Sequence, residues 1–335
     1  MPTLRRLLWG LCASAGLLAT PAQAWGPQGH KAVGAIADQL IAGTPAAKKV
    51  RAILGSNLQI ASVWADCARS VEGKAGTWTY ARPGQYKDCA TYENKASQDA
   101  MLAFVKRNAS YCGFMAGETR CRHTGWHFTN VAIQRNQYAP GLPGAGADDL
   151  VQAINACITV LQGGKAPAGF QIRGQREALR LLVHFVGDLH QPLHVGAIYL
   201  SDQGKPLNPA NAAEAHAHKN SGGNALLLKG SKLHALWDNV PGKLSTRVGG
   251  AGATAARQVQ PSIGAIDSWP ALWASDSLGA AAQAFQGLTF GAKSAGAWPT
   301  TAAEPAYRLA RENLQQAQLV KGGARLAQLL TTLFP

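Results

Sequence analysis

Apolar residues recur at helical intervals in several stretches of the chain. The stretches cover residues 33–54, 95–107, 148–161, 174–189 and 303–330. In the fourth stretch Leu179, Leu182 and Val186 are three or four positions apart, which places them on one face of a helix. The pattern therefore predicts a mainly α-helical protein.

Strand-like patterns are short and few. The best candidates are residues 126–133 and 223–228, which are rich in aromatic, β-branched or leucine residues. They are enough for a small β-hairpin element but not for a sheet-based domain. Because no convincing linker interrupts the pattern, we predict that residues 25–335 form one large helical domain.

The N-terminus has the order of a secretory signal. Arg5 and Arg6 precede an apolar run at residues 7–19, and the small-x-small triplet Ala22-Gln23-Ala24 follows. The apolar run is shorter than the roughly 20 residues that span a bilayer. We expect residues 1–24 to be removed, so that a periplasmic or secreted protein begins at Trp25. No stable membrane insertion is expected.

Charge narrows the choice of partners only slightly. Without Arg5 and Arg6 the chain keeps 30 basic residues against 18 acidic ones, a net charge of +12. Such an excess favours polyanionic partners, either nucleic acid or an anionic membrane surface. The basic residues form no dense block, so the signal is weak by itself.

Five cysteines remain after the predicted cleavage. In an oxidising compartment they allow two disulfides and one free thiol, and the short loops suggest Cys67 with Cys89 and Cys112 with Cys121, leaving Cys157. A zinc–thiolate site is the alternative. The absence of any CxxC spacing favours disulfides.

Candidate chemistry concentrates in "HFVGDLHQPLH", residues 184–194. His184 and Asp188 are four positions apart, so a helix would project both side chains from one face, where they could bind one ion. Pro192 should bend or end this helix. His194 could then turn toward a neighbouring site.

A second pair, His234 and Asp238, has the same spacing. Alone it would be read as an ordinary helix face. Two HxxxD pairs in one chain make a metal site a better interpretation, because imidazole nitrogen with carboxylate oxygen is a typical ligand set for zinc. Asp66 and His127 complete the candidates, although alone they would be read as a helix cap and a core histidine.

The order of these motifs resembles that of a known family. Trp25, His30, "WAD", "HF", "HxxxD" with "QPLH", "GGN" and a second "HxxxD" follow one another as in the zinc-dependent S1/P1 nucleases, which are related to bacterial zinc phospholipases C. The resemblance covers nearly all of residues 25–335. It implies the helical fold of the phospholipase C/P1 nuclease type.

The resemblance also implies three Zn²⁺ ions. The first would be held by Asp66, His127, His184 and Asp188, the second by Trp25, His30 and Asp188, and the third by His194, His234 and Asp238. Trp25 would bind through its own α-amino nitrogen and carbonyl oxygen. Signal cleavage would then create a ligand, because an amide nitrogen has no available lone pair.

The implied activity is that of an endonuclease and 3′-nucleotidase. Single-stranded DNA and RNA, and the 3′-phosphates of nucleotides, would be cut at the P–O3′ bond to give 5′-phosphate products. Asp66 and Asp188 would serve catalysis, with Arg69 neutralising charge in the transition state. Phe128 would stack on a base, and Asn224 would read base edges. Asn130 stands where fungal members carry an acid, so the base preference is open.

Two other functions fit part of the pattern. A phospholipase C could use the same ligands on a lipid head group, although Phe128, Asn224 and the basic charge argue against it. A non-catalytic zinc-binding or adhesion protein could keep the ligands for stability. We expect a monomer, a hydrogen bond from His190 to one ligand, and solvated side chains for His216 and His218.

Overall fold

The computed structural model describes residues 25–73, 77–81, 83–109, 113–115, 118–120, 122–240 and 244–335. The predicted signal segment and the suggested Cys112–Cys121 disulfide lie outside these residues. The other suggested disulfide, Cys67–Cys89, is present, and Cys157 is a buried free thiol. No helix within the described ranges is both long and apolar enough to cross a membrane.

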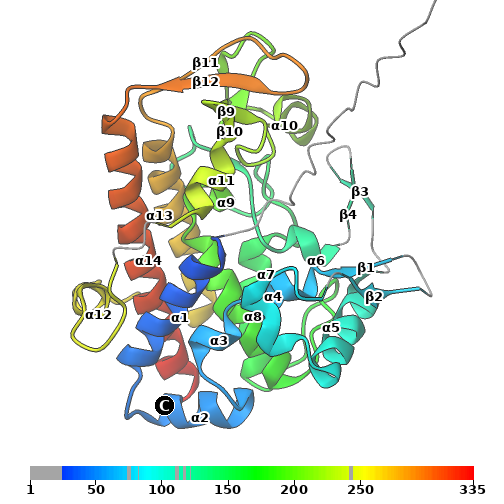
Figure 1. The fold of residues 1–335 in the computed structure, drawn as a ribbon, viewed down its shortest axis with the longest axis vertical. Coiled ribbons are helices and arrows are strands. Elements are labelled where there is room, and N and C mark those ends of the chain that lie inside the picture. Colours follow the sequence, from blue (N-terminus) through cyan, green and yellow to red (C-terminus); the bar gives the residue numbers. More distant parts are fainter. Residues whose placement is uncertain are drawn as a thin grey trace, which may run out of the picture.

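Helices make up most of the fold (Figure 1). The α-helices are α1 (Pro27–Leu40), α2 (Pro45–Leu54), α3 (Leu58–Ala61), α4 (Trp64–Ala68), α5 (Lys95–Asn108), α6 (Arg122–Gly125), α7 (Leu150–Leu161), α8 (Gly174–Leu189), α9 (Pro192–Val195), α10 (Ala212–His218), α11 (Leu233–Asp238), α12 (Ala251–Ala256), α13 (Trp269–Ala284) and α14 (Ala306–Leu333). Two 3₁₀ helices are η1 (Lys87–Tyr92) and η3 (Ile266–Ser268). The prediction of a mainly α-helical fold is confirmed.

The strands are short. They are β1 (Val71–Glu72), β2 (Thr79–Tyr80), β3 (Gly113–Met115), β4 (Glu118–Arg120), β5 (Val131–Ala132), β6 (Gly196–Ala197), β7 (Tyr199–Leu200), β8 (Pro206–Leu207), β9 (Leu226–Leu228), β10 (Ser231–Lys232), β11 (Leu288–Phe290) and β12 (Trp298–Ala302). The largest sheet among the described residues has the order β10-β9-β12-β11, with β9 and β12 parallel and the other two pairs antiparallel. It lies at the top of the molecule in Figure 1.

The two strand candidates do not pair with each other. Strand β5 is only two residues long and pairs in parallel with β6, whereas β9 forms its hairpin with β10. The predicted small β-hairpin element is present: β9, within residues 223–228, forms it with β10, and residues 126–133 are not part of it. Strand β5 pairs with β6, and β9 also pairs with β12; both are non-local pairings that residue patterns do not encode.

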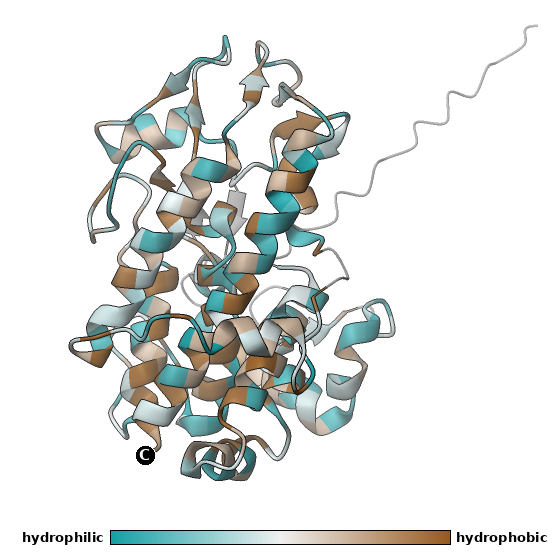
Figure 2. Ribbon diagram, turned by 90° about the vertical axis from the view of Figure 1, so that its left-hand side faces the viewer, coloured by the Kyte–Doolittle hydropathy of each residue, from teal (hydrophilic) through white to brown (hydrophobic). Residues whose placement is uncertain are grey.

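Helix α8 lies at the centre of the fold. Helices α1, α2, α3, α4, α7 and α14 all pack against it. Every residue from Leu181 to Leu189 is buried, including two polar side chains, His184 and Asp188. Figure 2 shows apolar and polar residues interspersed along the long helices. Polar groups on α8 can therefore be satisfied only by neighbouring elements, not by bulk water.

Two hydrophobic cores meet near the end of α8. The larger core includes Trp25 and Phe185 and fills the space among α1, α7, α8, α13 and α14. The smaller core lies against the four-stranded sheet and includes Leu193, Leu233 and Trp237. Helices α9 and α11 thus pack into the second core beside the end of α8.

Most predicted helices agree with the structure, with two differences. The predicted helix at residues 33–54 is two helices, because the chain turns at Gly43 (φ +81°) and Thr44 caps α2 by accepting from the amide of Ala47. Helix α13 was not predicted, since its alanine-rich sequence lacks a clear apolar stripe. The prediction that Pro192 bends or ends its helix is confirmed: α8 stops at Leu189 and Pro192 begins α9.

The close contact between α1 and α3 at Gly34 leads to a prediction about stability. A Cβ at Gly34 would come within 2.7 Å of the Leu58 carbonyl oxygen and 2.8 Å of the Gln59 nitrogen. Gly34→Ala should therefore lower the free energy of unfolding by about 1–3 kcal/mol, measured by urea denaturation. The matched control is Gly279→Ala in α13, where a Cβ meets nothing within 4 Å. That change should stabilise by about 0.5–1 kcal/mol, and equal losses in both variants would contradict this packing.

Candidate metal centre

Helix α8 supplies two buried polar side chains from one face. His184 and Asp188 are both fully buried, and His184 Nε2 lies 3.2 Å from Asp188 Oδ2. Gly187 lies between them in sequence, and a Cβ there would come within 2.7 Å of His30 Nδ1. The glycine therefore lets α1 bring His30 close to α8.

Three further elements converge on this pair. Helix α1 places His30 Nε2 at 3.3 Å from Asp188 Oδ1, and the segment after α6 places His127 Nδ1 at 3.0 Å from Asp188 Oδ2. From α4, Asp66 Oδ1 approaches His184 Nε2 at 3.7 Å. The two oxygens of Asp188 thus face different imidazoles, as a bridging carboxylate requires.

A second group lies beyond the end of α8. Helix α9 carries His194, and α11 carries His234 and Asp238 four residues apart. His234 Nε2 is 3.4 Å from Asp238 Oδ2 and 3.2 Å from His194 Nε2. His194 also links the two groups, because its Nδ1 lies 3.8 Å from Asp188 Oδ1.

Backbone carbonyls fix the orientation of the imidazoles. The Nδ1 atoms of His184, His194 and His234 donate to the carbonyl oxygens of Ser62 (2.7 Å), His127 (2.6 Å) and Gly222 (2.6 Å). In the neutral tautomer each Nε2 then carries its lone pair toward the cluster. For His194 and His234 the two lone pairs point at each other across 3.2 Å, a repulsion that a cation between them would relieve.

Burial and neighbouring charges shift the pKa values of the cluster. Burial alone would lower the pKa of the His184 imidazole, but the charges of Asp188 and Asp66 outweigh it and raise the pKa to about 9. Burial opposes ionisation of the Asp188 carboxyl, yet His184 and the hydrogen bonds from the imidazoles hold its pKa well below the usual range. Burial lowers the pKa of His127 to about 4. Without a metal ion, the centre thus combines an ionised Asp188 and a protonated His184 with a neutral His127.

Several buried atoms of the cluster have no hydrogen-bond partner in the described part of the chain. They are both ring nitrogens of His30, Oδ2 of Asp66 and Oδ1 of Asp188. Unsatisfied buried polar atoms of this kind call for an ion or water. Three sets of side chains bring their nitrogen and oxygen atoms within 4.8 Å of one another: His30, Asp66 and His184; His127, His184 and Asp188; and His194, His234 and Asp238. The donors, imidazole and carboxylate without thiolate, suit a divalent metal such as zinc.

Trp25 lies next to both groups. Its side chain is fully buried, and its Cβ would clash at 2.9 Å with any Cβ on Gly29, one residue before His30. The adjacent amide of Gly26 donates to the Asp238 carbonyl oxygen at 2.9 Å. The start of α1 is thereby tied to α11. All nine expected metal ligands are in one region; their roles as ligands, including that of the Trp25 amino group, stay predictions.

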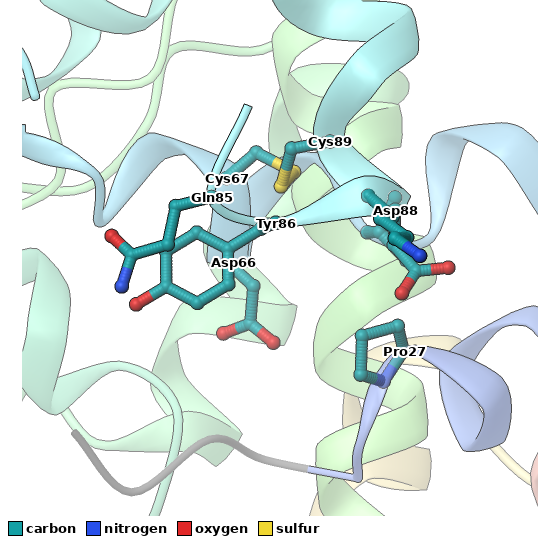
Figure 3. A pocket seen from close by; sticks show the side chains of 9 residues that line it. Pro27, Asp66, Cys67, Gln85, Tyr86, Asp88 and Cys89 are labelled. Atoms are coloured by element: carbon teal, nitrogen blue, oxygen red, sulfur yellow. A yellow bond between two sulfur atoms is a disulfide. The ribbon is translucent and has the colours of Figure 1, made fainter. Parts of the chain in front are cut away.

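Each residue expected to contact substrate lies near a cluster residue, either along the chain or through a hydrogen bond. Arg69 Nη1 donates to Asp66 Oδ1 at 3.3 Å (Figure 3 shows the Asp66 carboxylate). Phe128 and Asn130 are half-buried and flank Thr129, whose amide donates to the His194 carbonyl oxygen at 2.8 Å. Asn224, also half-buried, follows Gly222, the residue that accepts from His234.

Two residues near the cluster differ from the sequence-based expectation. Gln191 was not predicted, but it is fully buried and its Nε2 donates to Asp238 Oδ1 at 2.8 Å, which leaves Oδ2 toward His234. Its position in "HQPLH", between two predicted ligands, was the available signal. The expected bond from His190 to a ligand was wrong: His190 donates to the Val186 carbonyl oxygen, and its Nε2 accepts from Arg325.

Comparisons with known proteins point to nucleases. A family model described as S1/P1 Nuclease matches residues 25–335. Endonuclease 4 of Arabidopsis thaliana is 30% identical over 169 residues, which cover 47% of this chain and 50% of that protein. Endonuclease 5 of the same plant is 28% identical over 176 residues, covering 47% of this chain and 51% of its own length. The chain thus spans about half the length of the curated relatives it matches.

The raised pKa of His184 predicts how metal binding depends on pH. With a pKa of about 9, His184 is protonated at neutral pH in the metal-free protein, and an ion must displace that proton to use Nε2. Zinc affinity should therefore fall as the pH is lowered from about 8 to about 6, by up to about tenfold per unit for one competing proton. Calorimetry in two buffers of different ionisation enthalpy measures the proton released.

The control for this titration is His216→Gln, because His216 is exposed on α10 and outside all three side-chain sets. It should release the same number of protons as the unmodified chain. Metal binding without proton release at neutral pH would contradict the charge state assigned to His184.

Proposed function

The chain belongs to the S1/P1 nuclease family, and on that premise we propose that it is an exported zinc endonuclease and 3′-nucleotidase. Its substrates would be single-stranded DNA and RNA, and nucleotides with a 3′-phosphate. Water would add to phosphorus, the P–O3′ bond would break, and O3′ would leave with a proton. The products would carry 5′-phosphates.

One observation carries the proposal. Asp188 is fully buried and presents one oxygen to His30 and the other to His127 and His184, while His194 and His234 turn their Nε2 atoms toward each other nearby. Burying these groups without a cation leaves lone pairs opposed and carboxylate oxygens unpartnered. A binding site for several metal ions accounts for both features.

Three Zn²⁺ ions would share nine residues of this chain. We assign them as Asp66, His127, His184 and Asp188 for one ion, Trp25, His30 and Asp188 for the second, and His194, His234 and Asp238 for the third. Trp25 would contribute its free α-amino group after cleavage at residue 24. Uncleaved precursor would lack that group and should be inactive.

Zinc ions held there would acidify water and neutralise charge on a bound phosphate. The protein's own contribution is positioning and charge. Carbonyl oxygens of Ser62, His127 and Gly222 hold three imidazoles in one orientation, so little reorganisation is needed when substrate binds. The Arg69 guanidinium, held beside Asp66, would offset the negative charge that develops on the phosphate.

Substrate bases would be held by Phe128, Asn130 and Asn224. Phe128 would stack on any base, which suits cleavage of both DNA and RNA, and the two amides would contact base edges. In a duplex the bases are already stacked and paired. Single strands should therefore be cut faster than duplexes.

Asp66→Asn tests the catalytic role of the cluster. The change removes a negative charge from a nearly buried position beside His184 and Arg69, with little change in shape. We expect the rate of single-stranded DNA hydrolysis to fall on the order of 10²-fold or more, because the Asp66 carboxylate no longer balances the charge of the metal ions that act on the phosphate. Cleavage is measured with a fluorescently labelled oligonucleotide, and folding by circular dichroism.

Asp267→Asn is the matched control, because Asp267 is exposed on η3. It should keep full activity. A folded Asp66→Asn protein with undiminished hydrolysis would refute the proposal, and so would a zinc-loaded enzyme that cleaves phosphatidylcholine vesicles but not RNA. The latter result would favour the phospholipase C alternative.

Phe128→Ala tests base stacking. Loss of one base–aromatic stack is worth about 1–3 kcal/mol, so the KM for single-stranded DNA should rise about five- to 150-fold with a smaller effect on kcat. Phe128→Tyr keeps an aromatic face and should stay close to the unmodified enzyme. If alanine and tyrosine behave alike in steady-state kinetics, Phe128 is not a stacking residue.

A further inference from the structure

A cavity of about 390 Å³ opens beside Asp66. Its lining includes Val63. Figure 3 shows Pro27, Asp66, Gln85, Tyr86 and Asp88, which also line it. None of the three residues assigned above to base contacts lines it. The volume falls within the range of about 300–1,000 Å³ that is typical of small-ligand sites. The cavity is thus a separate compartment that touches the cluster through one carboxylate.

The outer wall of this cavity is held at several points. The Cys67–Cys89 disulfide ties η1 to α4, one residue from Asp66. Asp88 pairs with Lys31 of α1, and the amide of Gly84 donates to the Glu93 carboxylate at 2.8 Å. A wall fixed in this way loses little conformational entropy when a ligand binds.

The lining suits a nucleobase. Tyr86 is half-buried: it packs against the larger core and also lines the cavity. Gln85 is exposed and offers both donors and acceptors, while Pro27 and Val63 add apolar surface. The charge of Asp88 is balanced by Lys31, so it does not repel a polyanion as an unpaired acid would. An aromatic ring with adjacent amide and apolar groups is the usual composition of a base-stacking site.

We propose that this cavity binds the nucleotide on the 3′ side of the scissile phosphate, with its base against Tyr86. Asp66 belongs to both the cavity and the cluster, so one nucleotide can place its 5′-phosphate at the cluster and its base in the cavity. The nucleotide on the other side of the phosphate, which supplies O3′, would bind at Phe128 and Asn224. This inference rests on the proposed function.

The two substrate classes of the proposed enzyme distinguish the cavity from the base site at Phe128 and Asn224. A mononucleotide with a 3′-phosphate has only the nucleoside that supplies O3′ and nothing to place in the cavity. A dinucleotide has both parts. Residues of the cavity should therefore affect dinucleotides selectively.

The test compares Tyr86→Ala and Tyr86→Phe in the zinc-loaded enzyme, with dithymidine monophosphate and thymidine 3′-phosphate as substrates. For Tyr86→Ala the KM for the dinucleotide should rise about tenfold, whereas the KM for the mononucleotide stays within about twofold. Inhibition by the product thymidine 5′-phosphate should weaken about tenfold. Tyr86→Phe keeps the ring and should resemble the unmodified enzyme in all three measurements.

Other outcomes would overturn the assignment. Equal losses on both substrates would mean that Tyr86 only supports the fold, and no change on either would mean that the cavity is not used. A rise in KM confined to the mononucleotide would reverse the polarity proposed here. If the unmodified enzyme hydrolyses neither substrate, the proposed function fails. Calorimetric binding of thymidine 5′-phosphate, compared between the unmodified and Tyr86→Ala proteins, would still decide whether the cavity binds a nucleotide.

Discussion

A carboxylate buried among imidazoles is the constraint on which this structure depends. Moving Asp188 out of water costs several kcal/mol unless it is well compensated, and α8 carries it to a position with no exposure. Compensation comes from His30, His127 and His184, which reach it from three separate elements. Displacing any one of these elements would leave the charge of Asp188 without a partner. The positions of α1, α8 and the segment after α6 therefore depend on one another.

The imidazoles make their own demands on the surrounding chain. Three of the imidazoles are oriented by backbone carbonyls, at Ser62, His127 and Gly222. Each of these carbonyl groups has to point at an imidazole instead of along a regular helix or strand. Gly187 adds a steric demand, because only a residue without a side chain lets His30 approach α8. The short helices and turns around α8 therefore position the cluster as well as pack in the hydrophobic core.

The sequence predicted the parts of the site that depend on local spacing. The HxxxD interval puts His184 beside Asp188 and His234 beside Asp238 whatever the rest of the chain does. Convergence of the two pairs with His30 and Asp66 followed from family resemblance, since nothing in the spacing links distant segments. The carbonyl groups that accept from the histidine Nδ1 atoms could not be predicted, because every residue has a carbonyl and no residue type marks these positions. Helix α13 and the partners of β5 and β9 were missed for a related reason: tertiary packing, not a local pattern, determines them.

Burial divides the site into a fixed part and an adaptable part. His184 and Asp188 are enclosed by packed helices, so a change there disturbs several elements at once. Asn130 differs: its backbone is held by Gly144 and Tyr199, while its side chain is half-buried. An amide at this position can both donate and accept, whereas a carboxylate can only accept. If Asn130 contacts a base as proposed, replacing one by the other alters which base edges can be bound without moving the cluster, so substrate preference can change while the buried chemistry stays the same.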